Sequence, residues 1–455
     1  MKRTPLRIRF VLAAVKRFMQ RHFVLLAVLS PALASPLQAE VTRDDVLSIQ
    51  NGRFFLDGRP FAEISFNKFD LFWQLYGELA AGRTLDAANP MVQAQDRALR
   101  DLHEMGFRTI RIFALPWGPS GPAAYADPAK RRTLYAALDK TVELCDRYDI
   151  RLVWSLGAAT FTDTRLEPGK GWVFGEEQER ELISNRESRG RKLLDQYIDE
   201  TVTRYKHRKT VLMWEISNEV TLSADIGDRN RVFQGQRMPT LKEVAGFFDD
   251  VGRRIKANDP LRLVNSGGSH MRESQWHLYQ RQGWKKDSFE EQFQCFQLVY
   301  ANSAVDVIDV HSYPNNMPGY LIRGDDGKEA LLDHRGYMAI ARRLGKPLMI
   351  GELGLHAAVK TETKIWDQTP DYFESYDDLA AAKPRGREDL ELDHRRGRPP
   401  DLLVVLPVGS AHGPGPSPAV RHRPPPQSRT AGLLRGRQST PEGRTGRPEF
   451  SIIDL

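Results

Sequence analysis

The chain has 455 residues, of which 40% are hydrophobic and 27% are charged, so it is long enough for one large domain or two smaller ones. Its net charge of +7 arises at the two ends, because residues 1–39 carry seven Lys and Arg without an acidic residue and residues 384–450 carry twelve Arg. The body between them is mildly acidic. This balance argues against nucleic acid as its partner, since phosphate binding needs a basic surface.

Residues 1–39 have the pattern of a secretory signal peptide. Basic residues from Lys2 to Arg21 precede an apolar run at 23–29, and small residues follow with candidate cleavage sites at Ala34 and Ala39. The apolar run is shorter than the roughly 20 residues that span a bilayer. We therefore expect export to the periplasm or the cell exterior, without stable membrane insertion after cleavage. An uncleaved membrane anchor is the alternative.

Strand and helix patterns alternate after the signal. Residues 51–61 predict a hairpin with an Asp57-Gly58 turn. Further strands are predicted at 62–66, 109–113, 151–156, 211–216, 262–264, 305–310 and 347–351, and the clearest helices at 91–105, 128–148, 189–205, 241–257, 289–302 and 330–344. Strands separated by helices predict a parallel sheet and an α/β fold. The pattern fits a (β/α)8 TIM barrel over residues 40–383, although seven strands are one short of closure.

The eighth strand is expected after residue 383, where the composition changes abruptly. Residues 384–449 are rich in Arg, Pro and Gly and contain no Lys, Trp, Tyr or Phe. Such a sequence cannot build a core, so we expect 384–455 to be a disordered tail, with the eighth strand missing or replaced by tail residues. We favour translation out of frame over a polyanion-binding tail or a solvated linker. We do not expect the apolar run at 402–406 to act as a substitute strand.

Cysteines and histidines show no spacing typical of a metal site, and we expect no metal or cofactor. The two cysteines, Cys145 and Cys295, lie in separate helical patterns. Export permits a disulfide between them. We expect a buried free thiol at each position instead.

Two glutamates stand at the ends of predicted strands. Glu219 ends the segment Trp-Glu-Ile-Ser-Asn-Glu at 214–219, and Glu352 follows the strand at 347–351. A carboxylate at the end of a hydrophobic strand is costly to bury without a task. In a (β/α)8 barrel this end faces the catalytic mouth. Two carboxylates there are the minimum equipment for glycoside hydrolysis.

These segments resemble glycoside hydrolase family 5, the cellulase and mannanase family of clan A. The segment at 214–219 resembles the strand-four motif of the family, and Glu352 in Ile-Gly-Glu-Leu-Gly resembles its strand-seven nucleophile. Asp-Val-His-Ser-Tyr-Pro at 309–314 is similar to its strand-six motif, and Arg111 to its strand-two arginine. The resemblance spans residues 48–380.

The resemblance implies hydrolysis with retention of configuration. Glu219 is then the general acid and base, and Glu352 the nucleophile. Retention requires the two carboxyl groups to lie about 5–5.5 Å apart, whereas a separation near 8 Å indicates inversion.

Further residues are suited to support the reaction. Arg111 is suited to hold Glu352 ionised, with a structural ion pair as the alternative. Asn218 is suited to bind the sugar 2-hydroxyl. Tyr313 either donates to Glu352 or packs. His311 orients Glu219, lines the sugar subsite or is a core histidine.

Aromatic side chains offer stacking surfaces for sugar rings. Trp117 and Trp172 are candidates in the loops after the second and third strands. Phe69, Phe72 and Trp73 follow the first strand and are candidates to line the cleft. Core packing explains any one of these aromatic residues about as well as sugar binding does. Asn67, at the end of the first strand, is expected to reach the site.

Two departures from the family pattern stand out. Val220 follows Glu219 where the family usually has Pro, and this change bears on the local turn. No Trp occurs after Trp366, whereas the eighth strand of the family usually supplies a Trp to the sugar site. The second departure bears on whether the chain is active.

The sequence as a whole predicts an exported, monomeric, retaining endo-β-1,4-glycanase-like hydrolase acting on a β-linked glucan or mannan. The segments around Arg111, His311 and Glu352 lean slightly toward mannanases. An exo-acting β-glycosidase is the first alternative, with a cleft blocked by residues 157–189 and 221–239. A catalytically impaired sugar-binding protein is the second, and nucleic-acid binding by the tail ranks last.

Overall fold

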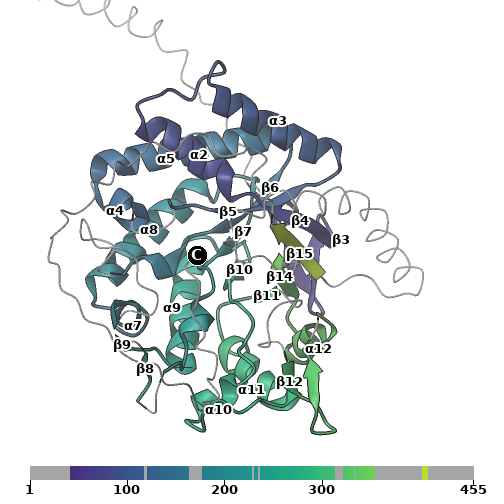
Figure 1. The fold of residues 1–455 in the computed structure, drawn as a ribbon. Helices are drawn as coiled ribbons and strands as arrows, with labels where there is room; N and C mark the ends of the chain where they lie inside the picture. Colours follow the sequence, from purple (N-terminus) through teal and green to yellow (C-terminus); the bar gives the residue numbers. More distant parts are fainter. Residues whose placement is uncertain are drawn as a thin grey trace, which may run out of the picture. The chain divides into compact units, whose positions relative to one another are not determined.

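The computed structural model describes residues 41–116, 120–162, 177–227, 230–233, 236–312, 321–332, 334–353 and 402–407. At its centre is an eight-stranded parallel sheet with helices around it (Figure 1). In chain order, the strands are β4 (Glu63–Asn67), β5 (Thr109–Phe113), β6 (Arg151–Ser155), β7 (Val211–Glu215), β10 (Val264–Asn265), β11 (Ile308–Ser312), β14 (Leu348–Leu353) and β15 (Leu402–Pro407).

Consecutive strands of this sheet pair with each other except β10 and β11, which are the two ends of the sheet, and β15 pairs with the first strand, β4. A parallel bridge between Asn265 and Val307 joins the end of β10 to the residue before β11. This circular order of parallel strands is that of a (β/α)8 barrel, so the predicted fold is confirmed.

The helices pack around the sheet and begin at clear capping signals. They are α2 (Phe69–Ala80), α3 (Pro90–Glu104), α4 (Ser120–Ala126), α5 (Pro128–Arg147), α7 (Glu177–Ser184), α8 (Arg189–Tyr205), α9 (Leu241–Asn258), α10 (Gln275–Tyr279), α11 (Phe289–Tyr300) and α12 (His334–Leu344). Asn89 caps α3 ahead of Pro90, and Thr240 forms a capping box with Glu243 at the start of α9. The helix predicted over 330–344 begins only at His334, because Ala330 and Leu331 pair with another strand.

Short elements lie outside the barrel. The predicted hairpin forms from β1 (Ser48–Gln50), β2 (Arg53–Leu56) and β3 (Arg59–Pro60), with Asp57 and Gly58 both at positive φ in the turn. Two further antiparallel pairs are β8 (Val232–Phe233) with β9 (Gln236–Arg237) and β12 (Leu321–Arg323) with β13 (Glu329–Leu331). The 3₁₀ helices are η1 (Arg43–Asp45), η2 (Ala158–Thr160) and η3 (Val220–Ser223).

The strand side chains divide between two hydrophobic cores, because alternate residues face opposite sides of a strand. Ile110 and Ile112 of β5 belong to the large core shared with the helices. Met213 and Met349 belong to a smaller core with Phe54 of the hairpin. Arg111 and Glu215 lie on strands that carry this alternation, and both are fully buried. The fold therefore places polar groups among close-packed strands, where they need partners.

A segment of the Arg-rich tail occupies the eighth strand position. Residues Leu402–Pro407 pair with β14 on one side and with β4 on the other. The expectation that this run would not act as a strand is therefore wrong, and the pairing agrees with the alternative that tail residues replace the eighth strand. Strand pairing uses backbone groups, so an apolar run of strand length suffices. The other residues of 384–455 lie outside the described ranges.

Both cysteines are free and buried, as predicted. Cys145 lies in α5 and Cys295 in α11, and burial raises the pKa of each thiol. Among the described helices, none combines the length and the apolar character needed to cross a membrane.

Candidate active site

Arg111 of β5 is the centre of a buried polar cluster. Its Nε and one terminal nitrogen bind the two carboxylate oxygens of Glu215 at 2.8 and 2.7 Å, and its other terminal nitrogen lies 2.9 Å from Oε1 of Glu352. Burial lowers the pKa of Arg111, but the charges of Glu215 and Glu352 outweigh it and the net shift is upward. Arg111 therefore stays charged and connects two strand-end carboxylates.

Two asparagines complete the coordination of Arg111. Its remaining N–H groups donate to Oδ1 of Asn67 at 3.0 Å and to Oδ1 of Asn218 at 2.8 Å, so all five guanidinium donors have an acceptor. Asn67 also donates to the carbonyl of Gly351 at 3.1 Å, which ties β4 to β14. Asn218 accepts through its oxygen, and its amide NH₂ is the part left to bind a ligand.

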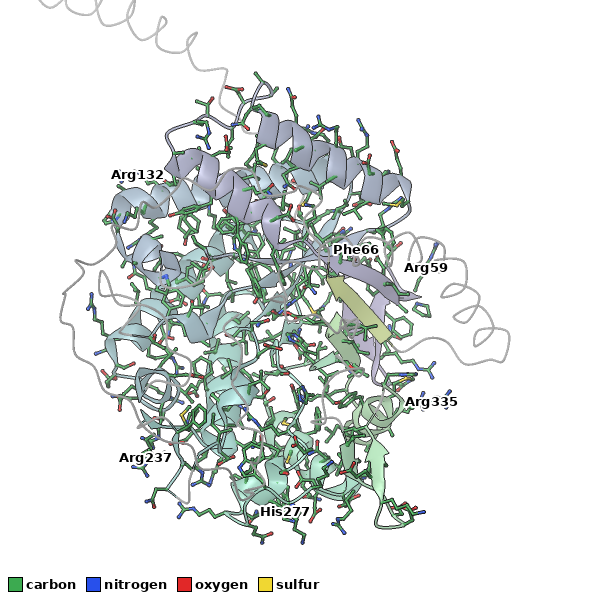
Figure 2. The ribbon with its side chains drawn as sticks, viewed as in Figure 1. Arg59, Phe66, Arg132, Arg237, His277 and Arg335 are labelled. Carbon is green, nitrogen blue, oxygen red and sulfur yellow. The ribbon has the colours of Figure 1, made fainter. Side chains whose placement is uncertain are left out.

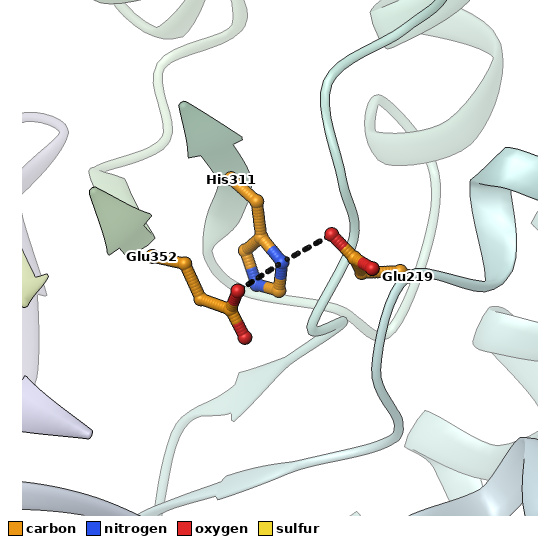
Figure 3. A group of neighbouring side chains, drawn as sticks. All are labelled: Glu219, His311 and Glu352. Atoms are coloured by element: carbon orange, nitrogen blue, oxygen red, sulfur yellow. Dashed lines mark hydrogen bonds and ion pairs between the residues drawn. The ribbon is translucent and has the colours of Figure 1, made fainter. Parts of the chain in front are cut away.

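Glu219 and Glu352 meet across His311 (Figure 3). Nδ1 of His311 lies 2.9 Å from Oε1 of Glu219 and 3.6 Å from Oε2 of Glu352. A carboxylate oxygen of Glu219 and one of Glu352 lie within 4.8 Å of each other. The imidazole is fully buried, whereas both carboxylates are partly exposed. The two acids thus stand close together at the barrel mouth with a positive group between them.

The charge of His311 is set by this position. Burial alone lowers its pKa, but the charges of Glu352 and Glu219 raise it to about 9. His311 is therefore an imidazolium at neutral pH and donates its Nδ1 proton to Glu219.

A glycine and a buried acid shape the strand beneath Glu352. The pairing of β11 with β14 shifts at Gly351, so that His311 faces Glu352. A Cβ at Gly351 would lie 2.7 Å from Oδ1 of Asp309 and 2.9 Å from Nε2 of His311. The backbone N–H of Gly351 donates to Asp309 at 2.9 Å. A side chain at position 351 would therefore displace the groups that orient Glu352.

Comparison with known proteins gives a consistent result. No protein-family model matches the chain. Mannan endo-1,4-beta-mannosidase 4 from Solanum lycopersicum is 23% identical over 345 residues, which are 71% of this chain and 77% of the relative. A glycoside hydrolase family 5 mannosidase from Rhizomucor miehei, solved in complex with mannosyl-fructose, superposes with a TM-score of 0.51 at 16% identity, covering 80% of this chain and 86% of that one. A second structure of this family 5 mannosidase gives 0.51 at 18% identity, covering 79% and 85%.

This chain resembles glycoside hydrolase family 5 in fold and in sequence. Six of the site residues predicted from the sequence lie together in the cluster, namely Glu219, Glu352, Arg111, Asn218, His311 and Asn67. Tyr313, Trp117 and Trp172 lie outside the described residues.

The contacts of Val220 and of two aromatic residues after the first strand explain why these residues are present. Val220, in place of the usual Pro, is buried and begins η3, and Glu219 reaches His311 with Val220 in place. Phe72 is buried in the large core. Phe69 stacks on Phe113 at 4.1 Å between ring centroids, and the Arg111 guanidinium lies 5.5 Å from the Phe69 ring. Phe69 therefore covers the buried cluster.

Sequence reasoning missed three residues of the cluster, which are Glu215, Asn265 and Asp309. Glu215 pairs with Arg111, and Asp309 accepts hydrogen bonds from Gly351 and, at 2.6 Å, from Asn265. The available signal was position, because Asp309 lies two residues before His311 on the same strand and Glu215 lies within the 214–219 segment that carries Glu219. Burial raises the pKa of Asp309 to about 7, with Glu215 adding to this and His311 and Arg111 opposing it.

Glu219, His311 and Glu352 also offer three ligand atoms that lie within 4.8 Å of one another, a spacing open to a metal ion. Metal binding requires a neutral imidazole. The same two carboxylates raise the pKa of His311 to about 9, so at neutral pH a metal ion would have to displace the imidazole proton.

Proposed function

We propose that the protein is an exported retaining glycoside hydrolase that cleaves β-linked mannan within the chain, with Glu219 as acid and base and Glu352 as nucleophile. The observation that carries this proposal is the approach of the two carboxylates to within 4.8 Å at the mouth of a (β/α)8 barrel. This approach of two carboxylate oxygens fits the separation of about 5–5.5 Å in retaining enzymes better than the roughly 6.5–9.5 Å of inverting ones.

In the first step, protonated Glu219 gives its proton to the glycosidic oxygen. The bond from this oxygen to the anomeric carbon breaks, and an oxygen of Glu352 bonds to that carbon. Arg111 holds Oε1 of Glu352, so we assign the attack to Oε2. The positive charges of Arg111 and His311 keep Glu352 ionised before it attacks.

In the second step, the Glu219 carboxylate takes a proton from water. The water oxygen bonds to the anomeric carbon, and the ester bond to Glu352 breaks. Two inversions at the same carbon give net retention. His311 holds Glu219 at 2.9 Å in both steps, which keeps the carboxyl group aimed at the reacting oxygen.

The names of the similar proteins support mannan over glucan. The curated relative from Solanum lycopersicum is a mannan endo-1,4-beta-mannosidase, and both Rhizomucor miehei structures are of a mannosidase. The first of these also favours action within the chain. Exo action is the second candidate, because the two structures are named mannosidase rather than mannanase.

The test is hydrolysis of β-mannan by the full chain. We expect oligosaccharides of several lengths from the start of digestion, and new reducing ends that are β by early NMR spectra. Release of mannose alone would show exo action, and α products would overturn retention. Binding of mannan without turnover would support the impaired sugar-binding protein instead.

Variants assign the roles of the two glutamates. Glu352→Gly should lower kcat by on the order of 10³-fold or more, and added azide should restore turnover with an α-glycosyl azide as product. Glu329→Gln, on the exposed β12–β13 hairpin, is the control and should leave kcat unchanged. Loss of activity in both variants, or no azide product, would overturn the assignment of Glu352.

A further inference from the structure

A second site lies apart from the carboxylate pair. A hollow of about 430 Å³ opens between α7, the β8–β9 hairpin and the first turn of α9, elements that lie side by side in Figure 1. Five cationic side chains line it together with the single carboxylate of Glu243, and they are Arg180, Arg231, Arg237, Lys242 and Arg281. This is a local excess of positive charge on a mildly acidic body.

Only part of this charge is neutralised. Arg180 pairs with Glu243 at 2.8 Å, and Arg231 pairs with the buried Asp225 at 2.6 Å. Arg237, Lys242 and Arg281 are exposed, and within the described part of the chain they form no ion pair. Figure 2 shows Arg237 at the edge of the molecule. Three positive charges are therefore left for a ligand.

The backbone at the hollow is strained. Arg231 and Arg281 have φ values of 59° and 61°, in the left-handed region that long side chains rarely occupy. Among the other described non-glycine residues with positive φ, all are Asn or Asp except Glu219. Such strain persists where the surrounding structure imposes it, and it collects at functional sites. Here the strained residues are Glu219, the proposed acid, and Arg231 and Arg281 at the hollow.

A short stretch of chain connects the two places. Six residues lead from Glu219 to Asp225, a span of at most roughly 20 Å even if extended. Asp225 holds Arg231 through one oxygen and accepts from the backbone N–H of Leu241, the first residue of α9, through the other at 2.9 Å. Connections from a strand to the next helix lie on the catalytic face of a barrel. The hollow therefore lies on the face where a polysaccharide would bind.

We propose that this hollow binds carboxylate groups of the polysaccharide, so that the preferred substrate carries uronic acid residues. Guanidinium groups match carboxylates in shape and bind them through paired hydrogen bonds. Arg237 and Arg281, with Lys242 beside them, supply this chemistry away from the bond that is cleaved. The inference rests on the proposed function for the identity of the substrate, and it assigns the hollow to binding rather than to catalysis.

The test compares glucomannan with glucomannan oxidised at C6 to uronic acid. Arg237→Gln/Arg281→Gln should raise KM for the oxidised polymer by about fivefold and leave kcat unchanged. KM for the untreated polymer should stay within about twofold of the wild-type value. The preference of the wild type for the oxidised polymer should fall as salt is added. The control is Arg59→Gln/Arg132→Gln, two exposed arginines away from the hollow, which should change neither KM (Figure 2).

Equal changes on both polymers, or the same change in the control, would overturn the assignment of the hollow. If neither polymer is cleaved, the proposed function fails, and calorimetric titration with oxidised glucomannan tests the hollow by itself. Binding by the wild type that the double variant loses supports the inference. Absence of binding overturns it, as does binding of inorganic phosphate without binding of the oxidised polymer.

Discussion

Nδ1 of His311 lies 2.9 Å from Oε1 of Glu219, and the imidazole carries a pKa raised to about 9. The ring is fully buried, and the second carboxylate, Glu352, lies 3.6 Å from the same nitrogen. Two acids that approach this closely repel each other when both are ionised. The charge of His311 offsets this repulsion, which makes the histidine a positioning and electrostatic group rather than a packed core residue.

Replacement of His311 by Asn should therefore change the pH profile as well as the rate. The wild type should lose activity as the pH rises through about 9, where His311 loses its proton, and the variant should lack this loss. The value of kcat/KM should fall by roughly 10–100-fold because Glu219 is less well aimed. His207→Asn, at an exposed position, is the control. A loss of activity near pH 9 that persists in His311→Asn would contradict this role.

Arg111 should not tolerate conversion to Lys. An ammonium group has three donors and cannot serve Glu215, Glu352, Asn67 and Asn218 as the five-donor guanidinium does. We expect a free energy of unfolding lower by about 3 kcal/mol, because the buried Glu215 loses its bidentate partner. Urea unfolding and kcat measure the two effects.

Arg83→Lys is the matched control, because Arg83 also forms a paired contact with a glutamate, Glu78, but at an exposed position. It should cost less than about 1 kcal/mol. Equal losses in the two variants would mean that burial of the Arg111 cluster contributes little.

Much of the barrel could be predicted because the periodicity of its segments is strong. The strand over 109–113 coincides with β5, and the helix over 189–205 coincides with α8. The helix predicted from Ala330 was wrong at its start, because Ala330 pairs with Ile322 across a hairpin that periodicity does not reveal. The hydrophobic pattern thus located the strands and helices. Strand pairing, which the pattern does not reveal, moved the start of α12 to His334.

Most of the site was predicted, but two of its buried acids, Glu215 and Asp309, were missed. Glu219 follows β7, and Glu352 stands next to the last residue of β14, so both attract notice as acids at the end of an apolar run, whereas Glu215 and Asp309 are buried in their strands. A buried acid inside a strand has meaning only through its partner, here Arg111 for Glu215 and Gly351 for Asp309. These partners lie about 100 and 40 residues away in the sequence. Motif reading does not supply such pairings.

The eighth strand gives a prediction about the tail. Strand β15 pairs with β14 and β4, so removing it leaves two strand edges without partners. A chain that ends at Pro400 should unfold at a temperature lower by at least about 5 °C or fail to fold, whereas a chain that ends at Gly409 should match the full chain. Equal melting temperatures for the two truncated chains would contradict the pairing.

Gly351→Ala should lower activity without unfolding the barrel. The added Cβ would approach Asp309 to 2.7 Å and His311 to 2.9 Å, so the strand carrying Glu352 must shift. We expect kcat to fall by on the order of 10²-fold and the free energy of unfolding by about 1–3 kcal/mol. Gly246→Ala is the control, because its Cβ meets no neighbour in α9, and it should raise stability by about 0.5–1 kcal/mol.

Asp309 should make the stability of the protein depend on pH in a direction opposite to most acids. Its pKa is raised from 3.8 to about 7 by burial, so the native state holds a proton that the unfolded state has lost between these values. The stability this proton contributes is fully present below pH 3.8 and is lost as the pH rises through 7. Asp309→Asn removes the titration while keeping the shape of the side chain.

The melting temperature of Asp309→Asn minus that of the wild type should therefore increase from pH 4 to pH 8. The increase should be roughly 2 °C or more for each kcal/mol of stability that the wild type loses over this range. The charged groups that act on Asp309 are Arg111, Glu215 and His311, and all three are retained in the variant. Asp101→Asn, at an exposed position, should show a constant difference from the wild type. A difference for Asp309→Asn that stays constant over the same range would mean that Asp309 is ionised throughout. Arg111 and His311 would then outweigh its burial.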